Sequence, residues 1–80
     1  MAAKATLHEI VARALRVPAA SISDESSPET LRRWDSLNHL DLMTEIEETY
    51  GVQFSTADMV RVRSVRQIRD LLREKGIDVA

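Results

Sequence analysis

The chain of 80 residues contains no cysteine and only two glycines, two prolines and three aromatic residues. Without cysteine it can form neither a disulfide nor a thiolate centre for catalysis or metal binding, and a reducing compartment suits it. The longest stretch without a charged residue, 49–57, has nine residues, whereas a helix that spans a bilayer needs roughly 20 apolar residues. The first residues lack the apolar segment of a signal peptide. These absences predict a cytoplasmic protein without a membrane segment.

Hydrophobic residues make up 44% of the chain and charged residues 30%, which is typical of a globular domain. A chain this short buries only about 60% of the surface that its unfolded form exposes, so nearly every apolar residue must contribute to the core. We expect one domain, residues 1–80, that exists as a monomer. Residues 21–58 carry nine acids and two bases, and residues 61–75 carry six bases and two acids. Such a polarised molecule attracts partners of opposite charge to its two parts.

The apolar spacing predicts three amphipathic helices: one that begins at Thr6 and is closed by Pro18, one from about Asp35 to Tyr50, and one from Ser64 to Gly76. Thr6 with Glu9, and Ser64 with Gln67, have the spacing of capping boxes. The two glycines, 51 and 76, each directly follow an apolar helical pattern, where a helix C-terminus favours glycine.

Between these helices lie a short extra turn that begins near Ser55 and a connection of nearly twenty residues, 16–34. Loops this long are uncommon in compact domains, and Ile22, Leu31 and Trp34 are the expected anchors that tie it to the core. No strand pattern of useful length occurs. The prediction is an all-α fold: a small four-helix bundle, three main helices and one short, with a long loop between the first two.

The helix at 35–50 has apolar residues on two faces. One stripe faces the core and comprises Leu42, Met43, Ile46 and Tyr50. The acidic face, as we name the residues on the other side, comprises Leu37, Leu40, Asp41, Thr44, Glu45 and Glu48. Two interpretations stay open and are compatible: the two leucines pack under the long loop, or the acidic face docks a basic partner with an apolar pocket.

Ser36 lies in the first turn of the same helix. A serine there is usually a helix cap. A phosphate esterified to its oxygen would instead lie against free backbone N–H groups and the positive end of the helix dipole.

The residues around Ser36 resemble the attachment motif of acyl carrier proteins. The resemblance lies in Trp34-Asp35-Ser36-Leu37-Asn38-His39-Leu40-Asp41-Leu42, in the helix end Glu47-Glu48-x-Tyr50-Gly51, and in the length and acidic second helix of the chain. It implies that Ser36 carries 4′-phosphopantetheine, added from coenzyme A by a phosphopantetheinyl transferase, with Asp35 in support as a cap, as a ligand for the Mg²⁺ of the transferase, or both. The chain would then be a non-catalytic carrier that presents an acyl thioester to acyl-loading and acyl-transfer enzymes.

A departure from the common pattern points to a subgroup. Trp34, with Arg32 and Arg33 before it, replaces the small residue of many fatty-acid carriers. This form resembles discrete carriers of specialised pathways such as polyketide biosynthesis, and Met1 also favours a discrete chain. A peptidyl carrier is an alternative, but the Gly-Gly-x-Ser-Leu motif typical of that group is absent.

Other functions find less support. A partly buried, hydrogen-bonded His39 is expected, since no orienting partner or substrate pocket accompanies it. The basic stretch 61–69 would suit a helix that binds nucleic acid or a membrane surface, but the isoelectric point of about 5.6 argues against nucleic acid. The chain has no metal-ligand spacing and is too short to enclose a substrate pocket. We expect no catalytic residue, no metal site, and no nucleic-acid or membrane partner.

Overall fold

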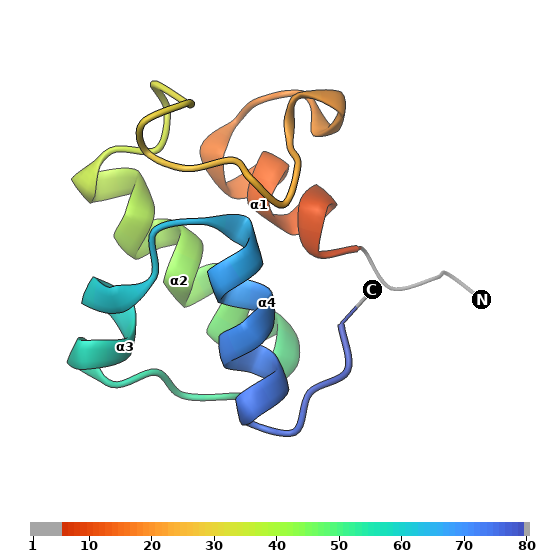
Figure 1. Ribbon diagram of the computed structural model, residues 1–80, viewed down its shortest axis with the longest axis vertical. Coiled ribbons are helices and arrows are strands. Elements are labelled where there is room, and N and C mark those ends of the chain that lie inside the picture. Colours follow the sequence, from red (N-terminus) through yellow and green to blue (C-terminus); the bar gives the residue numbers. More distant parts are fainter. Residues whose placement is uncertain (1–5, 80) are drawn as a thin grey trace.

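The computed structural model describes residues 6–79, which form four α-helices and one 3₁₀ turn, with no strand among them. In chain order these elements are α1 (Leu7–Leu15), η1 (Ala19–Ser21), α2 (Ser36–Tyr50), α3 (Thr56–Arg61) and α4 (Val65–Glu74) (Figure 1). The predicted all-α fold is confirmed, with three main helices, a short fourth one, and a long connection between the first two.

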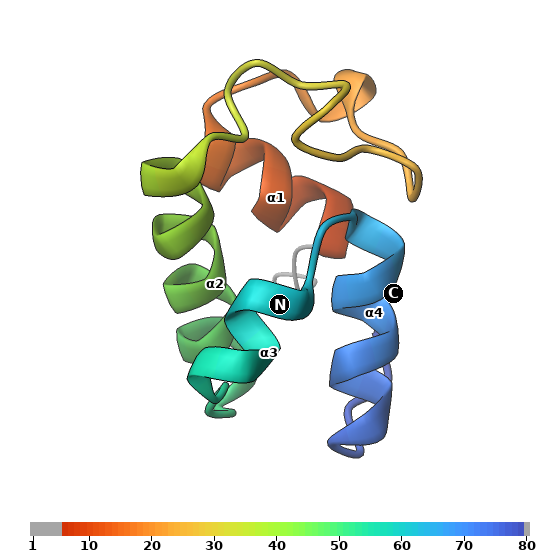
Figure 2. The same ribbon diagram turned by 60° about the vertical axis from the view of Figure 1, so that its left-hand side comes forward.

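The helices enclose a single apolar core. Figure 2 shows α2 and α4 standing on opposite sides, with α1 between them near one end and α3 between them near the other. Helix α1 packs against both α2 and α4. The core includes the predicted stripe residues Leu42, Met43 and Ile46, each fully buried, whereas Tyr50 packs at the margin. No helix within 6–79 combines the length and the apolar character needed to cross a bilayer.

Two of the helix starts were predicted as capping boxes, and one of the two forms completely. The Thr6 hydroxyl accepts a hydrogen bond from the Glu9 amide, and the Glu9 carboxylate accepts one from the Thr6 amide. At α4 the Ser64 hydroxyl accepts from the Gln67 amide as expected, but the Gln67 side chain accepts from the amide of Arg63. The second box is therefore only half formed, and the side chain of Gln67 secures the preceding residue instead.

The helix ends follow the backbone preferences of the sequence. Gly51 and Gly76 both adopt positive φ angles, 67° and 83°, which an L side chain rarely adopts. Helix α1 ends without glycine: Arg16 takes the left-handed conformation at φ 60°. The helix cannot continue because Val17 precedes Pro18, and the residue before a proline is disfavoured in the helical region.

The long connection is held to the core along its length. Of its three predicted anchors, Ile22 and Trp34 are buried and Leu31 is half-buried against the core. A buried serine, Ser26, accepts a hydrogen bond from the amide of Ser23 and closes a turn inside the connection. The connection is thus an ordered part of the fold.

The connection also completes the start of α4. The carbonyl oxygen of Ser26 accepts a hydrogen bond of 3.1 Å from the Val65 amide, and that of Asp24 accepts one of 2.9 Å from the Arg66 amide. The first amides of a helix have no partner within the helix. The long connection therefore supplies backbone acceptors that α4 could not find in itself.

Charge pairing reinforces this contact. Three acidic residues of the connection bind three arginines in or just before α4: Asp24 with Arg69, Glu25 with Arg66, and Glu29 with Arg63. Charges that the sequence placed in two oppositely charged segments thus meet within the molecule. At these six residues the opposite charges of the two segments are paired with each other, which weakens the charge separation that the sequence predicts.

Asp24 is the member of this network on which stability should depend most visibly. Its Oδ1 accepts from His8 Nε2 at 2.7 Å and from Arg69 Nη2 at 3.1 Å. The hydrogen bond from His8, and after it the bond and charge of Arg69, lower the pKa of Asp24 below its ordinary value of 3.8, although partial burial opposes them. The ionised carboxylate therefore contributes its full stabilisation at pH values above the ordinary pKa of 3.8. This contribution is lost as the pH falls through the lowered pKa of the folded protein.

Asp24→Asn should accordingly reduce stability at neutral pH and flatten the loss of stability on acidification. Urea unfolding between pH 2 and pH 7 measures both effects. The matched control is Asp70→Asn, which removes an exposed carboxylate of α4 that has no ion pair within 6–79 and should retain the wild-type pH dependence. An unchanged acid slope in Asp24→Asn would contradict the assignment.

Candidate functional site

The start of α2 is capped by Asp35, so the side chain of the neighbouring Ser36 is not needed as a cap. Asp35 is the N-cap, and its Oδ1 accepts a hydrogen bond of 2.9 Å from the Asn38 amide. The Asn38 side chain in turn donates to the carbonyl oxygen of Arg33 at 2.6 Å, which ties the preceding backbone to the helix. The predicted capping role of Asp35 is confirmed.

Ser36 is the first residue of α2 and is exposed. Since Asp35 performs the capping, the Ser36 hydroxyl is not needed for it, and it has no hydrogen-bond partner within residues 6–79. The hydroxyl lies at the positive end of a fifteen-residue helix, where free amides stabilise an attached anion. The surroundings of Ser36 therefore fit a covalently bound phosphate.

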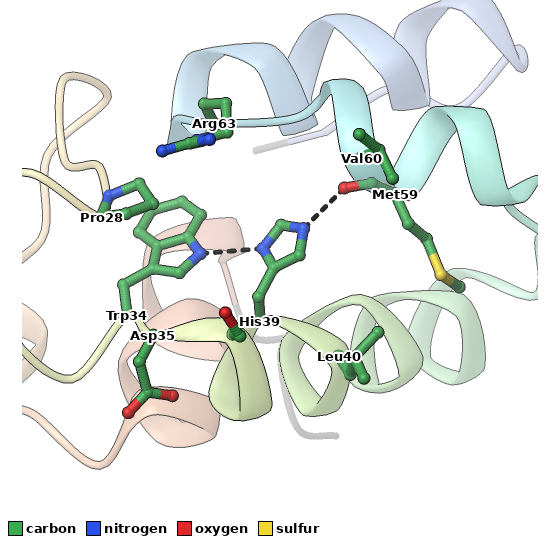
Figure 3. A pocket seen from close by; sticks show the side chains of 9 residues that line it. Pro28, Trp34, Asp35, His39, Leu40, Met59, Val60 and Arg63 are labelled. Atoms are coloured by element: carbon green, nitrogen blue, oxygen red, sulfur yellow. Dashed lines mark hydrogen bonds between the residues drawn. The ribbon is translucent and has the colours of Figure 1, made fainter.

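Two hydrogen bonds form a line that connects Trp34, the residue before the cap, through His39 to α3. The indole Nε1 of Trp34 donates to His39 Nδ1 at 2.9 Å, and the planes of the two rings are inclined by 21° with centroids 6.1 Å apart. Because Nδ1 accepts, the proton of the neutral imidazole is on Nε2, which donates to the carbonyl oxygen of Met59 at 2.7 Å (Figure 3). The histidine is half-buried and hydrogen-bonded on both sides, as predicted. It connects α3 to the start of α2.

A cavity of about 460 Å³ adjoins this line and Ser36. Most of its lining is apolar, and the lining residues are Pro28, Trp34, Asp35, Ser36, His39, Leu40, Met59, Val60 and Arg63. Figure 3 shows Asp35 directed away from the other labelled side chains. Arg63 lies on the side of the Trp34 ring opposite to Asp35 (Figure 3). The volume lies in the range of small-ligand sites, so the expectation that the chain is too short for a pocket of this size is wrong. There is room beside Ser36 for part of a flexible arm.

The acidic face of α2 is open on most of its surface. Leu37 and Leu40 are 77% and 53% exposed, which rules out that the long connection covers them. Asp41, Thr44 and Glu48 are also exposed. Glu45 is half-buried and pairs with Arg13 of α1 at 3.2 Å. The structure thus brings the predicted surface residues together on one helix, with Glu45 partly neutralised.

Sequence reasoning missed the contribution of α3. Val60 is 72% exposed and lines the cavity together with Met59, whose carbonyl oxygen holds His39. Helix α3 has only six residues, too few for a reliable apolar period. Val60 and Leu40 line the same cavity, so the exposed apolar surface there includes residues of both α2 and α3.

The basic stretch 61–69 is mostly occupied by intramolecular partners. Besides the three arginines bound to the long connection, Arg61 lies within 3.4 Å of Asp58 and 3.6 Å of Glu74. A nucleic-acid-binding helix needs cations that are free to meet phosphates. Binding of nucleic acid by this stretch would therefore have to compete with these intramolecular ion pairs.

Two comparisons with known proteins identify the same family. The family described as "phosphopantetheine attachment site" matches residues 5–72. An acyl carrier protein of Syntrophus aciditrophicus (strain SB) is 30% identical over 69 residues, which cover 86% of this chain and 86% of that protein. Both similarities include the start of α2, the acidic face and α3.

The hydrogen bond between Trp34 and His39 can be measured by a double-mutant cycle. Trp34→Phe and His39→Leu each remove one partner and should cost about 1–3 kcal/mol, because a buried polar group loses its partner. The coupling free energy should be about 1 kcal/mol, so the double variant is less destabilised than the sum of the two. Urea unfolding of all four proteins gives this value, and strictly additive effects would show that the bond contributes nothing.

Proposed function

Because the chain belongs to the acyl carrier proteins with a phosphopantetheine attachment site, we propose that it carries an acyl intermediate as a thioester on a 4′-phosphopantetheine arm joined to Ser36. Domains of this family carry that prosthetic group. The observation that supports Ser36 as the attachment residue is its exposed hydroxyl at the first position of α2, released from capping by Asp35. The chain itself would be non-catalytic, and partner enzymes would perform the chemistry.

The attachment needs a separate phosphopantetheinyl transferase and coenzyme A. In this reaction the Ser36 hydroxyl loses its proton and its oxygen attacks the phosphate next to the pantetheine. The phosphoanhydride bond of coenzyme A breaks, adenosine 3′,5′-bisphosphate leaves, and a phosphodiester joins the pantetheine to Ser36. The new negative charge would lie at the N-terminus of α2, which stabilises it. Of the Asp35 carboxylate, Oδ1 is held by the Asn38 amide. We propose that Oδ2 contacts the transferase and its Mg²⁺.

The acidic face of α2 is the proposed docking surface for the transferase and for the acyl-loading and acyl-transfer enzymes. Its exposed leucines offer apolar anchors, and its carboxylates, chiefly Asp41 and Glu48, surround them. Carboxylates at the rim of such a surface mainly accelerate association with a basic partner. Val60 of α3 extends the apolar patch next to the cavity.

A specialised pathway of the polyketide type, located in the cytoplasm, is the proposed context. The support is the Trp34 form of the motif together with the structural role of the indole. Trp34 forms one wall of the cavity and is itself only 2% exposed. From the Trp34 form of the motif we also expect the cargo to be a short acyl group.

Ser36→Ala should abolish the mass increase that follows incubation with coenzyme A, Mg²⁺ and a promiscuous phosphopantetheinyl transferase. Since Asp35 provides the cap, the variant should lose no more than about 0.5 kcal/mol of stability. Thr49→Ala, which removes an exposed hydroxyl on the same helix outside the acidic face, is the control and should be modified like the wild type. Intact-protein mass spectrometry reads the result, and a mass gain in Ser36→Ala would refute the assignment.

Reversing the charge of Asp41 or Glu48 to lysine should slow the modification severalfold at low salt and weaken its salt dependence. Stability should change little, because exposed charges contribute about 0–1 kcal/mol. Asp70→Lys on α4 changes the net charge by the same amount outside the acidic face, so it controls for overall charge. Initial rates at several ionic strengths measure the effect. Equal slowing by all three reversals would place the docking surface elsewhere.

A further inference from the structure

The cavity beside Ser36 has a cation at its rim that the attachment chemistry described above does not use. Three of the nine lining residues are ionisable, namely Asp35, His39 and Arg63. Asp35 caps α2 and is directed away from the cavity in Figure 3. His39 already uses both ring nitrogens. Among residues 6–79, Arg63 is therefore the one positively charged residue of the lining with donors to spare.

The ion pair between Arg63 and Glu29 is weak enough for Arg63 to exchange Glu29 for another anion. Its Nη2 donates to Glu29 Oε2 at 3.0 Å, but the two side chains are 60% and 69% exposed. Ion pairs as exposed as this one contribute little stability. The Arg63 backbone, by contrast, is fixed, since its amide donates to Gln67. A flexible guanidinium on a fixed base can leave Glu29 for a better-placed anion, and a guanidinium binds oxyanions in a bidentate manner.

We infer that Arg63 binds an oxyanion of the arm that Ser36 carries and thereby holds the arm against the apolar cavity; this rests on Ser36 being the attachment residue. The arm brings a phosphodiester in every loaded state. A cargo that ends in a carboxylate brings a second oxyanion of the same chemistry. The apolar lining from Pro28, Leu40 and Val60 would contact the uncharged part of the arm.

The test compares loaded forms of the wild type and Arg63→Gln. Each protein is loaded by a transferase with coenzyme A, acetyl-coenzyme A or malonyl-coenzyme A, and intact mass establishes complete loading. The phosphorus NMR shift of the phosphodiester and the fluorescence of Trp34, the only tryptophan, report the contact. Melting temperatures give a third measurement: the gain on loading should fall by about 2–4 °C in the variant, the size expected for an exposed charge contact in a domain of this length.

Two further variants sharpen the comparison. Arg33→Gln removes an exposed arginine near Ser36 that does not line the cavity, so it controls for the general effect of positive charge. Glu29→Gln removes the competing partner of Arg63 and should increase the spectral change on loading.

A loss in Arg63→Gln alone, in all three loaded forms, supports binding of the phosphodiester. A loss confined to the malonyl form supports binding of the cargo carboxylate. Loaded Arg63→Gln that matches the wild type in every form, or an equal loss in Arg33→Gln, overturns the inference while leaving the attachment at Ser36 intact. Absence of any mass gain on loading the wild type overturns the proposed function, and the inference with it.

Discussion

The indole N–H of Trp34 is buried and must find an acceptor inside the protein, since an unpaired buried donor costs about 1–3 kcal/mol. It finds Nδ1 of His39, five residues further along the chain. Because Nδ1 accepts this hydrogen bond, the imidazole proton is on Nε2. Nε2 then needs an acceptor, which is the carbonyl oxygen of Met59. One donor thus determines a tautomer, the position of α3 beside α2, and the wall of the cavity next to Ser36.

The second constraint is that a bundle this small cannot hold a long connection by apolar contact alone. Ile22 and Trp34 bury the two ends of the segment, and its middle is acidic. The acidic middle meets the arginines of α4, so charges that would repel one another within each segment become mutually compensating. The acidic face of α2 is left outside this network except for Glu45, which pairs with Arg13. Within residues 6–79, Asp41 and Glu48 of this face therefore have no ion pair, whereas the charges of the connection and of α4 largely compensate one another.

Local signals in the sequence predict the four helices, because caps and breakers act over a few residues. Thr6 with Glu9, the N-cap Asp35 and the terminal glycines all lie where those signals indicate. The motif predicts Ser36 as the candidate attachment residue, and the N-cap beside it predicts that its hydroxyl is not needed for capping. The neighbours that depend on distant contacts could not be predicted in this way. Nothing local marks Met59 or Arg63 as a neighbour of Ser36, since the short α3 has no periodicity of its own and its position is set by a histidine twenty residues away.

The backbone bonds from the long connection to α4 bear on how the molecule opens. The amides of Val65 and Arg66 find their acceptors about forty residues earlier in the chain, in Ser26 and Asp24. A helix whose first turn is completed by a distant segment cannot fray from that end independently of it. The connection and the start of α4 therefore form one cooperative unit, and partial unfolding there exposes both together. Because the backbone acceptors for the first turn of α4 lie in the connection, α4 gains its full stability only when the loop-closure entropy of these distant contacts has been overcome.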